Sequence, residues 1–169
     1  MSGKLSVVEN LDIGLEDESL KDCVEKTSVI LAGTYALYLK TQYYHWNVVG
    51  AEFYNLHKMF EEQYEELRDA VDDIAERIRT LGGVSPGTFR EFLELNFIEE
   101  DSEVPQDWRE MVANLEAGHS SLAKEYRRCV VEIAKHNDEG TTDMFTQRIQ
   151  VHEKTAWMLR SLLKSKTVS

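Results

Sequence analysis

Only two prolines, Pro86 and Pro105, interrupt this chain of 169 residues, and both lie near its middle. Proline breaks helices, so its absence elsewhere leaves long stretches free to be helical. On both sides of the prolines, apolar side chains recur at steps of three and four residues, which is the spacing of one helix face. The sequence therefore predicts an all-α fold.

Four long helices are expected, over residues 19–50, 53–81, 107–136 and 142–164. Ser19 and Asp22 resemble a capping box for the first helix, and Gly82 and Gly83 should stop the second. Residues 88–95 predict a short amphipathic helix in the long crossover between the second and third helices. A long link at this point is typical of a ferritin-like four-helix bundle.

The length suits a single domain, residues 1–169, with mobile tails at about 1–15 and 165–169. Nineteen basic against 31 acidic side chains give a net charge of −12, which opposes attraction to DNA or anionic lipid and favours cations. No apolar stretch approaches the roughly 20 residues that span a bilayer, and no secretory hydrophobic region is seen at the start. We expect a soluble, cytoplasmic protein without a membrane partner.

Cys23 and Cys129 have no CxxC spacing and no Cys or His partner near them in sequence. A zinc site or a disulfide framework built on them is therefore not expected. Both are interpreted as reduced residues within the bundle.

One stripe of the second helix carries His57, Glu61, Asp72 and Glu76. At 1.5 Å per residue, residues 61 and 72 lie roughly 16 Å apart and residues 57 and 76 roughly 28 Å apart, so one helix cannot bring the four together. Both pairs share a midpoint, between positions 66 and 67. Two copies packed antiparallel across a two-fold axis would therefore form two identical clusters.

Carboxylates and imidazoles crowded into a half-buried interface would cost several kcal/mol without a cation. Such a mixed oxygen and nitrogen set suits Fe(II), Mn(II) or Zn(II). The alternative is a charged, solvated helix face, because nine acids lie between Glu52 and Glu76 and some will fall on any stripe. Similarly, His45 lies on the apolar stripe of the first helix, and the alternative for this residue is a packed, hydrogen-bonded histidine.

The run His45-Trp46-Asn47-Val48-Val49-Gly50-x-x-Phe53-x-x-x-His57-x-x-x-Glu61 resembles the metal-site signature of the Dps family, the dodecameric miniferritins. Asp72-x-x-x-Glu76-Arg77 and Leu81-Gly82-Gly83 continue this signature. The likeness extends over about residues 20–164, including the phrase at 152–159 in the last helix.

This resemblance implies a ferroxidase centre in which His45, His57 and Glu61 of one subunit meet Asp72 and Glu76 of its two-fold mate. His45 enters this set by the resemblance alone. Up to two iron ions would occupy the centre, with Zn possible as a competing ion. Fe(II) would be oxidised to Fe(III), preferably by hydrogen peroxide, and stored as mineral in a hollow dodecamer, which protects the cell from oxidative damage.

Some residues depart from the family pattern or fit it in more than one way. Glu61 stands where many relatives have Asp, and the extra methylene alters the reach to the metal. Trp46 is expected either to quench stray oxidants or simply to pack beneath the site. Asp138 and Asp143 lie where relatives admit iron through acidic pores, although a solvated turn accounts for them nearly as well.

Other functions compete with this one. Glu116-x-x-His119 has the spacing of a ferritin di-iron motif inside one bundle, but Ile149 precedes His152 where a second such motif needs an acid. His119 and His152 are therefore interpreted as core histidines. DNA binding and compaction is doubtful at this net charge, and a shell that sequesters zinc without rapid ferroxidase activity is the third possibility.

Overall fold

The computed structural model describes residues 11–164. They form the helices α1 (Asp17–Asn47), α2 (Phe53–Thr80), α3 (Phe89–Leu95), α4 (Trp108–Ile133) and α5 (Glu139–Leu163), with a short 3-10 helix η1 (Ala134–His136) after α4. No strand occurs in that range. The all-α fold and the short helix within the crossover are confirmed.

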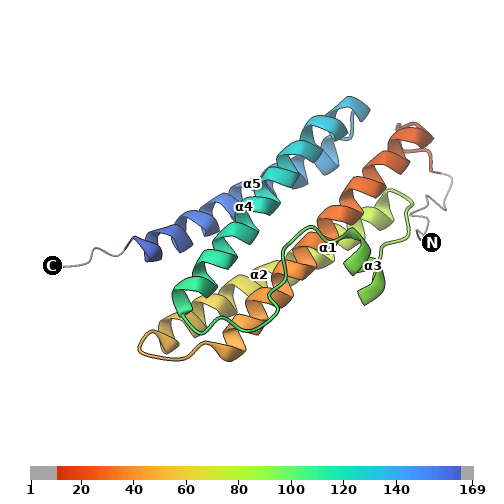
Figure 1. The fold of residues 1–169 in the computed structure, drawn as a ribbon. Coiled ribbons are helices and arrows are strands. Elements are labelled where there is room, and N and C mark those ends of the chain that lie inside the picture. Colours follow the sequence, from red (N-terminus) through yellow and green to blue (C-terminus); the bar gives the residue numbers. More distant parts are fainter. Residues whose placement is uncertain (1–10, 165–169) are drawn as a thin grey trace.

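The helices form two antiparallel pairs, α1 with α2 and α4 with α5 (Figure 1). The connection from α2 to α4 carries α3 and then runs back along the bundle, so that α2 and α4 point in the same direction. This topology is that of a ferritin-like bundle rather than an up-down-up-down one.

The first helix, α1, packs against α2, α3 and α4 and is therefore buried on several sides. Four of its buried side chains are hydroxylic, and each donates a hydrogen bond to the carbonyl oxygen four residues earlier at 2.7–2.8 Å: Thr27, Ser28, Thr34 and Thr41. Because these groups are satisfied within the helix, they do not need water. A helix with polar positions on its buried faces can thus occupy the interior.

Helix α2 has one apolar face, on which Leu56, Phe60, Leu67, Ile74 and Ile78 are buried. The helix ends as the sequence predicts. Gly82 takes a φ of 78°, and the Gly83 N–H donates to the Ile78 carbonyl oxygen at 3.0 Å. This is the hydrogen bond that closes a Schellman motif, and glycine adopts its left-handed residue without strain.

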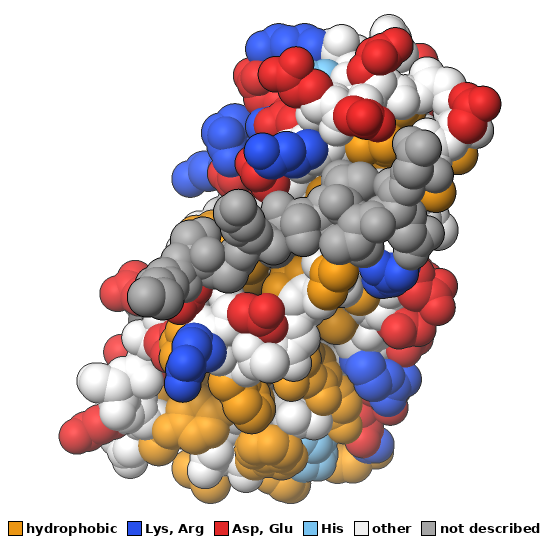
Figure 2. Space-filling view, turned by 90° about the vertical axis from the view of Figure 1, so that its right-hand side faces the viewer, with side chains coloured by type: hydrophobic (Ala, Val, Ile, Leu, Met, Phe, Trp, Pro, Cys, Tyr) orange, Lys and Arg blue, Asp and Glu red, His pale blue; other side chains and the backbone are white. Residues whose placement is uncertain are grey.

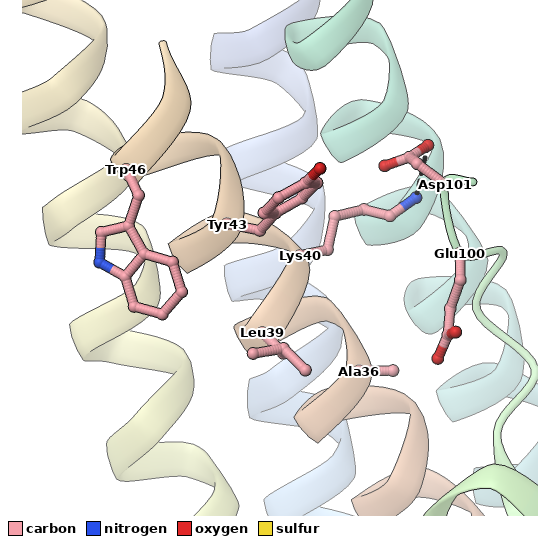
Figure 3. A pocket seen from close by; sticks show the side chains of 7 residues that line it. All are labelled: Ala36, Leu39, Lys40, Tyr43, Trp46, Glu100 and Asp101. Carbon is pink, nitrogen blue, oxygen red and sulfur yellow. Dashed lines mark hydrogen bonds and ion pairs between the residues drawn. The ribbon is translucent and has the colours of Figure 1, made fainter. Parts of the chain in front are cut away.

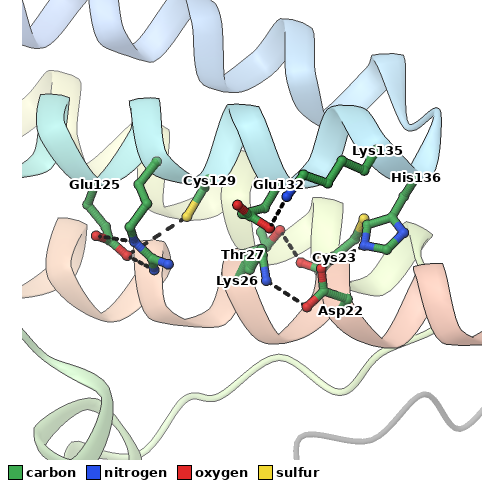
Figure 4. A network of polar contacts seen from close by, with 10 residues as sticks. Asp22, Cys23, Lys26, Thr27, Glu125, Cys129, Glu132, Lys135 and His136 are labelled. Carbon is green, nitrogen blue, oxygen red and sulfur yellow. Dashed lines mark hydrogen bonds and ion pairs between the residues drawn. The ribbon is translucent and has the colours of Figure 1, made fainter.

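The predicted capping box at Ser19 is wrong. Helix α1 begins earlier, at Asp17, with Glu16 as its N-cap and no side-chain cap. Asp22 instead lies 2.6 Å from Lys26 Nζ and 2.7 Å from His136 Nε2 (Figure 4). Its carboxylate therefore joins the start of α1 to the turn after α4.

Two other helix starts have side-chain caps. Thr88 and Glu91 form a capping box at α3. Helix α5 starts at Glu139, three residues before the predicted position, because Asp138 accepts a hydrogen bond from the Thr141 N–H at 3.0 Å. Asn137 takes the left-handed turn before it, with a φ of 56°.

The predicted mobile tails fall largely on residues 1–10 and 165–169, which lie outside the described residues. Of the remainder, Leu11 and Leu15 pack against the hydrophobic core. Within residues 11–164, no helix combines the length and the apolar character needed to cross a bilayer.

Candidate metal centre

The turn between α1 and α2 brings His45 and His57 together. Their imidazole rings stack with centroids 3.8 Å apart and planes 22° apart. His45 lies at the end of α1 and is 7% exposed, whereas His57 lies in the second turn of α2 and is partly exposed. The stripe residue of α2 and the apolar-face residue of α1 thus belong to one cluster.

Each of these rings is fixed by a hydrogen bond to the other residue's backbone. Nδ1 of His45 donates to the carbonyl oxygen of His57 at 2.9 Å, and Nδ1 of His57 donates to the carbonyl oxygen of His45 at 2.9 Å. A carbonyl oxygen only accepts, so the proton of each neutral ring is on Nδ1. Both Nε2 atoms therefore keep the lone pair that a metal ion requires.

Aromatic side chains hold the two rings from other sides. The centroid of the Phe53 ring lies 5.0 Å from that of the His57 ring, and the rings of Tyr64 and His45 form a T-shaped pair with centroids 5.1 Å apart. Tyr64 was not singled out by the sequence analysis as part of the site. Its spacing from Glu61, three residues along the same helix, places it on the same side of α2.

Glu61 follows His57 by one helical turn. Lys58, which sequence reasoning missed, donates to Glu61 Oε2 at 2.5 Å. This hydrogen bond holds the pKa of the Glu61 carboxyl below its ordinary value, and the positive charge of Lys58 acts in the same direction. The carboxylate is therefore ionised and ready to bind a cation.

Asp72 and Glu76 lie farther along α2 and are exposed. Position 72 is 11 residues after position 61, so the rise of a helix places Asp72 roughly 16 Å from Glu61, and Glu76 lies one further turn away. Within residues 11–164 of one chain, no group of three or more His, Cys, Asp or Glu side chains is arranged to hold a metal ion. One protomer thus presents two separate parts of the predicted ligand set.

Large apolar side chains near the histidine pair are exposed to solvent. Four that are 43–71% exposed occupy the end of α1, the following turn and the start of α2: Trp46, Val49, Phe53 and Tyr54. Figure 2 shows hydrophobic side chains gathered at this end of the molecule. A continuous apolar surface of this kind is a feature of protein interfaces.

Trp46 is 61% exposed and lines a shallow pocket on the outer side of α1 with Leu39, Tyr43 and residues of the crossover (Figure 3). Lys40 reaches from the same helix toward Asp101, 3.4 Å away. Within one chain, Trp46 therefore does not pack beneath the histidine pair. Its indole ring is open to solvent or to a partner.

The two predicted pore residues have different surroundings. Asp138 is 3% exposed, caps α5 and accepts a hydrogen bond from Arg77 at 2.6 Å. Asp143 is exposed on the first turns of α5 and accepts a hydrogen bond from Gln147 at 2.6 Å. Asp138 thus connects α5 to α2 through Arg77, whereas the carboxylate of Asp143 faces outward.

His119 and His152 are buried in the bundle with their Nδ1 atoms 2.9 Å apart. Burial lowers the pKa of His119 to about 3 and that of His152 well below its ordinary value, so both rings are neutral at neutral pH. Glu116, the other half of the ferritin-like motif, binds Arg160 at 2.5 Å and Ser120 at 2.9 Å instead. The motif does not assemble a metal site within the bundle.

Comparison with known proteins agrees with this architecture. Residues 25–167 match the family model of the ferritin-like domain. An uncharacterised low temperature-induced protein of Nostoc sp. is 39% identical over 159 residues, covering 94% of this chain and 89% of the relative. The DNA protection during starvation protein 2 of Bacillus anthracis is 33% identical over 150 residues, covering 85% of this chain and 97% of the relative.

The crystal structure of a Dps protein from Vibrio cholerae O1, described as a member of a broad superfamily of ferritin-like diiron-carboxylate proteins, superimposes with a TM-score of 0.87. It is 33% identical and covers 94% of this chain and 99% of its own. The bundle, its long crossover and its histidine and carboxylate stripe thus define a ferritin-like protein. Within that class, the chain belongs to the Dps family.

Proposed function

We propose that this protein is an iron-storing ferroxidase of the cytoplasm. It oxidises Fe(II) to Fe(III), preferably with hydrogen peroxide, and keeps the product as mineral inside a hollow dodecamer. The description of the Vibrio structure as a diiron-carboxylate protein supports iron as the substrate. The histidine pair with its two free Nε2 atoms is the observation that carries the proposal.

The complete centre requires two chains. Two α2 helices that pack antiparallel, with their midpoints between Glu66 and Leu67 superimposed, bring Asp72 of one chain opposite Glu61 of the other. The same register brings Glu76 opposite His57. The uncovered apolar side chains around the turn, among them Trp46 and Phe53, supply the surface that such a partner would cover.

The donor set fits ferrous iron. Imidazole nitrogens from His45 and His57 combine with carboxylates from Glu61, Asp72 and Glu76, a mixture suited to Fe(II) and also to Zn(II), which would compete. The three carboxylates offset the positive charge that grows as the metal is oxidised. Two Fe(II) ions each give up one electron, and hydrogen peroxide with two protons leaves as two water molecules.

Iron must reach these centres and the interior from outside. We assign this step to the exposed carboxylate of Asp143 at the start of α5, repeated around an acidic pore. Trp46, exposed beside His45 at the end of α1, is placed to reduce stray oxidants.

Complementation between two inactive variants tests the shared centre. His57→Ala removes a ligand from one half of the site, and Asp72→Ala removes a ligand from the other half. In a dimer that contains one chain of each kind, one centre lacks both ligands and the other centre is complete. Random co-assembly of equal amounts should therefore restore about one quarter of the wild-type centres.

The readout is the absorbance of Fe(III) after rapid mixing of Fe(II) and peroxide with the refolded, mixed protein. Each variant assembled alone should lack the fast phase. A mixture that stays inactive, although size-exclusion chromatography shows intact mixed shells, would refute the shared centre. Rapid oxidation by either variant alone would refute the ligand assignment.

The relative named for DNA protection raises a second function, DNA binding. The net charge of −12 per chain, multiplied over an assembly, opposes contact with phosphates. A shell that only sequesters zinc would also use these ligands, but it would give no ferric absorbance in the mixing experiment.

A further inference from the structure

A pocket of about 340 Å³ opens between α2 and α5, away from the candidate metal centre. These helices make few contacts with each other, because each packs mainly against its own antiparallel neighbour. Met59, Val151 and Met158 form apolar parts of the pocket wall, and Gln63 and His119 line it as well. The other lining residues are Glu62, Glu66, Lys154 and Thr155, so apolar and polar groups are combined, as in sites for small molecules.

A directed chain of hydrogen bonds ends at this pocket. Arg148, paired with Glu66, places its NH2 group 3.4 Å from His152 Nε2. Arginine only donates, so His152 Nε2 accepts, and the proton of this neutral ring is on Nδ1. His152 Nδ1 then donates to His119 Nδ1 at 2.9 Å, which leaves the proton of His119 on Nε2.

Two buried polar atoms of the pocket residues are without a hydrogen-bond partner among residues 11–164: His119 Nε2 and Gln63 Oε1. His119 is 1% exposed, so its N–H group cannot simply turn to bulk water. An unsatisfied buried donor is destabilising, because it has given up its hydrogen bonds to water without replacing them. Together the two atoms supply one donor and one acceptor, on side chains that line the pocket.

We propose that this pocket binds a small, neutral molecule that has an apolar body and a terminal hydroxyl group. The hydroxyl oxygen accepts from His119 Nε2, and its proton is donated to Gln63 Oε1. The apolar body lies against the methionines, whose thioethers make favourable contacts with aromatic rings. A phenol combines these features.

The same chain of hydrogen bonds excludes a metal ion. A metal needs the lone pair of His119 Nε2, but the proton is held there because His152 must accept from Arg148. The site is thus distinct in chemistry from the candidate iron centre.

Binding of phenol, compared with toluene, tests the proposal on the assembled protein. The two compounds have nearly the same shape, but toluene lacks the hydroxyl group. Isothermal titration calorimetry should show phenol binding about tenfold or more tightly than toluene, because toluene leaves both buried polar atoms unpaired. A crystal soaked in phenol should show the ring between α2 and α5.

Gln63→Leu should weaken phenol binding about 5- to 10-fold, the loss of one hydrogen bond, and leave toluene binding unchanged. Gln150→Leu, at an exposed position of α5, is the matched control and should change neither. His119→Phe should abolish the preference for phenol. No binding of phenol, equal binding of toluene, or an unchanged phenol affinity in Gln63→Leu would each overturn the proposal.

Discussion

Lys58 and Glu61 form an ion pair one helical turn apart on α2, with Lys58 Nζ 2.5 Å from Glu61 Oε2. A proposed iron ligand is therefore already paired with a cation in the single chain. Any metal ion that binds Glu61 must share this carboxylate with the ammonium group or displace it. Lys58 thus reduces the affinity of the centre for divalent cations.

Replacement of Lys58 measures this competition. Lys58→Ala should bind Zn(II) or Fe(II) up to about fivefold more tightly, since an exposed ion pair is weak and screened by solvent. Anaerobic calorimetry at low ionic strength provides the measurement. Lys124→Ala, an exposed lysine on α4, changes the net charge equally and should leave affinity unchanged. Equal affinities for wild type and Lys58→Ala would contradict the competition.

The buried pair His119 and His152 should make the protein sensitive to acid. The pKa of His119 is lowered to about 3 in the folded state, whereas an unfolded histidine titrates near 6.5. Below pH 6.5 the unfolded chain therefore binds more protons, and stability falls by up to about 1.4 kcal/mol per pH unit for each histidine until the folded pKa is reached. Above pH 6.5 this contribution is fully present.

Denaturant unfolding at a series of pH values between 7 and 4 would measure this loss. The double variant His119→Leu, His152→Leu removes both groups and should show a shallower decline over that range. Carboxylates elsewhere contribute equally to both proteins, so the difference between the two slopes isolates the histidines. Identical slopes would rule out their contribution.

The two acids at the start of α5 should respond differently to alanine. Asp138→Ala removes the helix cap and the buried partner of Arg77, and it should lower the free energy of unfolding by about 2–4 kcal/mol. Asp143→Ala should change stability by less than about 0.5 kcal/mol and slow iron uptake severalfold. Thermal unfolding and the rate of mineral formation separate the two effects. Slow uptake without lost stability in Asp138→Ala would reverse the roles.

The acidic surface should keep the assembled protein from DNA. In a gel-shift assay at low salt, where phosphate contacts are strongest, plasmid mobility should remain that of free DNA. A basic Dps protein of known DNA affinity is the positive control. Retarded plasmid at low salt that returns to free mobility as salt is added would demonstrate an electrostatic DNA complex.

Much of the fold follows from local sequence patterns. The span of α2 and its stop at Gly82 and Gly83 were predicted closely, because apolar periodicity and a glycine cap are both local signals. The start of α1 was not, since the acid of the supposed capping box binds His136 from the far end of α4. A contact across 114 residues leaves no trace in the local pattern.

In the candidate site, too, some features follow from local sequence patterns and others depend on tertiary contacts. The four stripe residues of α2 follow from helical spacing, but the stacked rings of His45 and His57 depend on the angle at which two helices meet. The wheel of α1 alone left His45 as a core residue. Likewise, the pairing of His119 with His152 required both helices to be in place, although their core location was inferred from the apolar seams.

The two reciprocal hydrogen bonds between His45 and His57 hold together the helix ends on either side of the short link of residues 48–52. The same two hydrogen bonds therefore brace the reversal of the chain and orient both imidazole rings. The imidazoles lose their rotational freedom during folding, so an arriving ion does not have to order them. The two Nε2 atoms are therefore in position before any ion arrives.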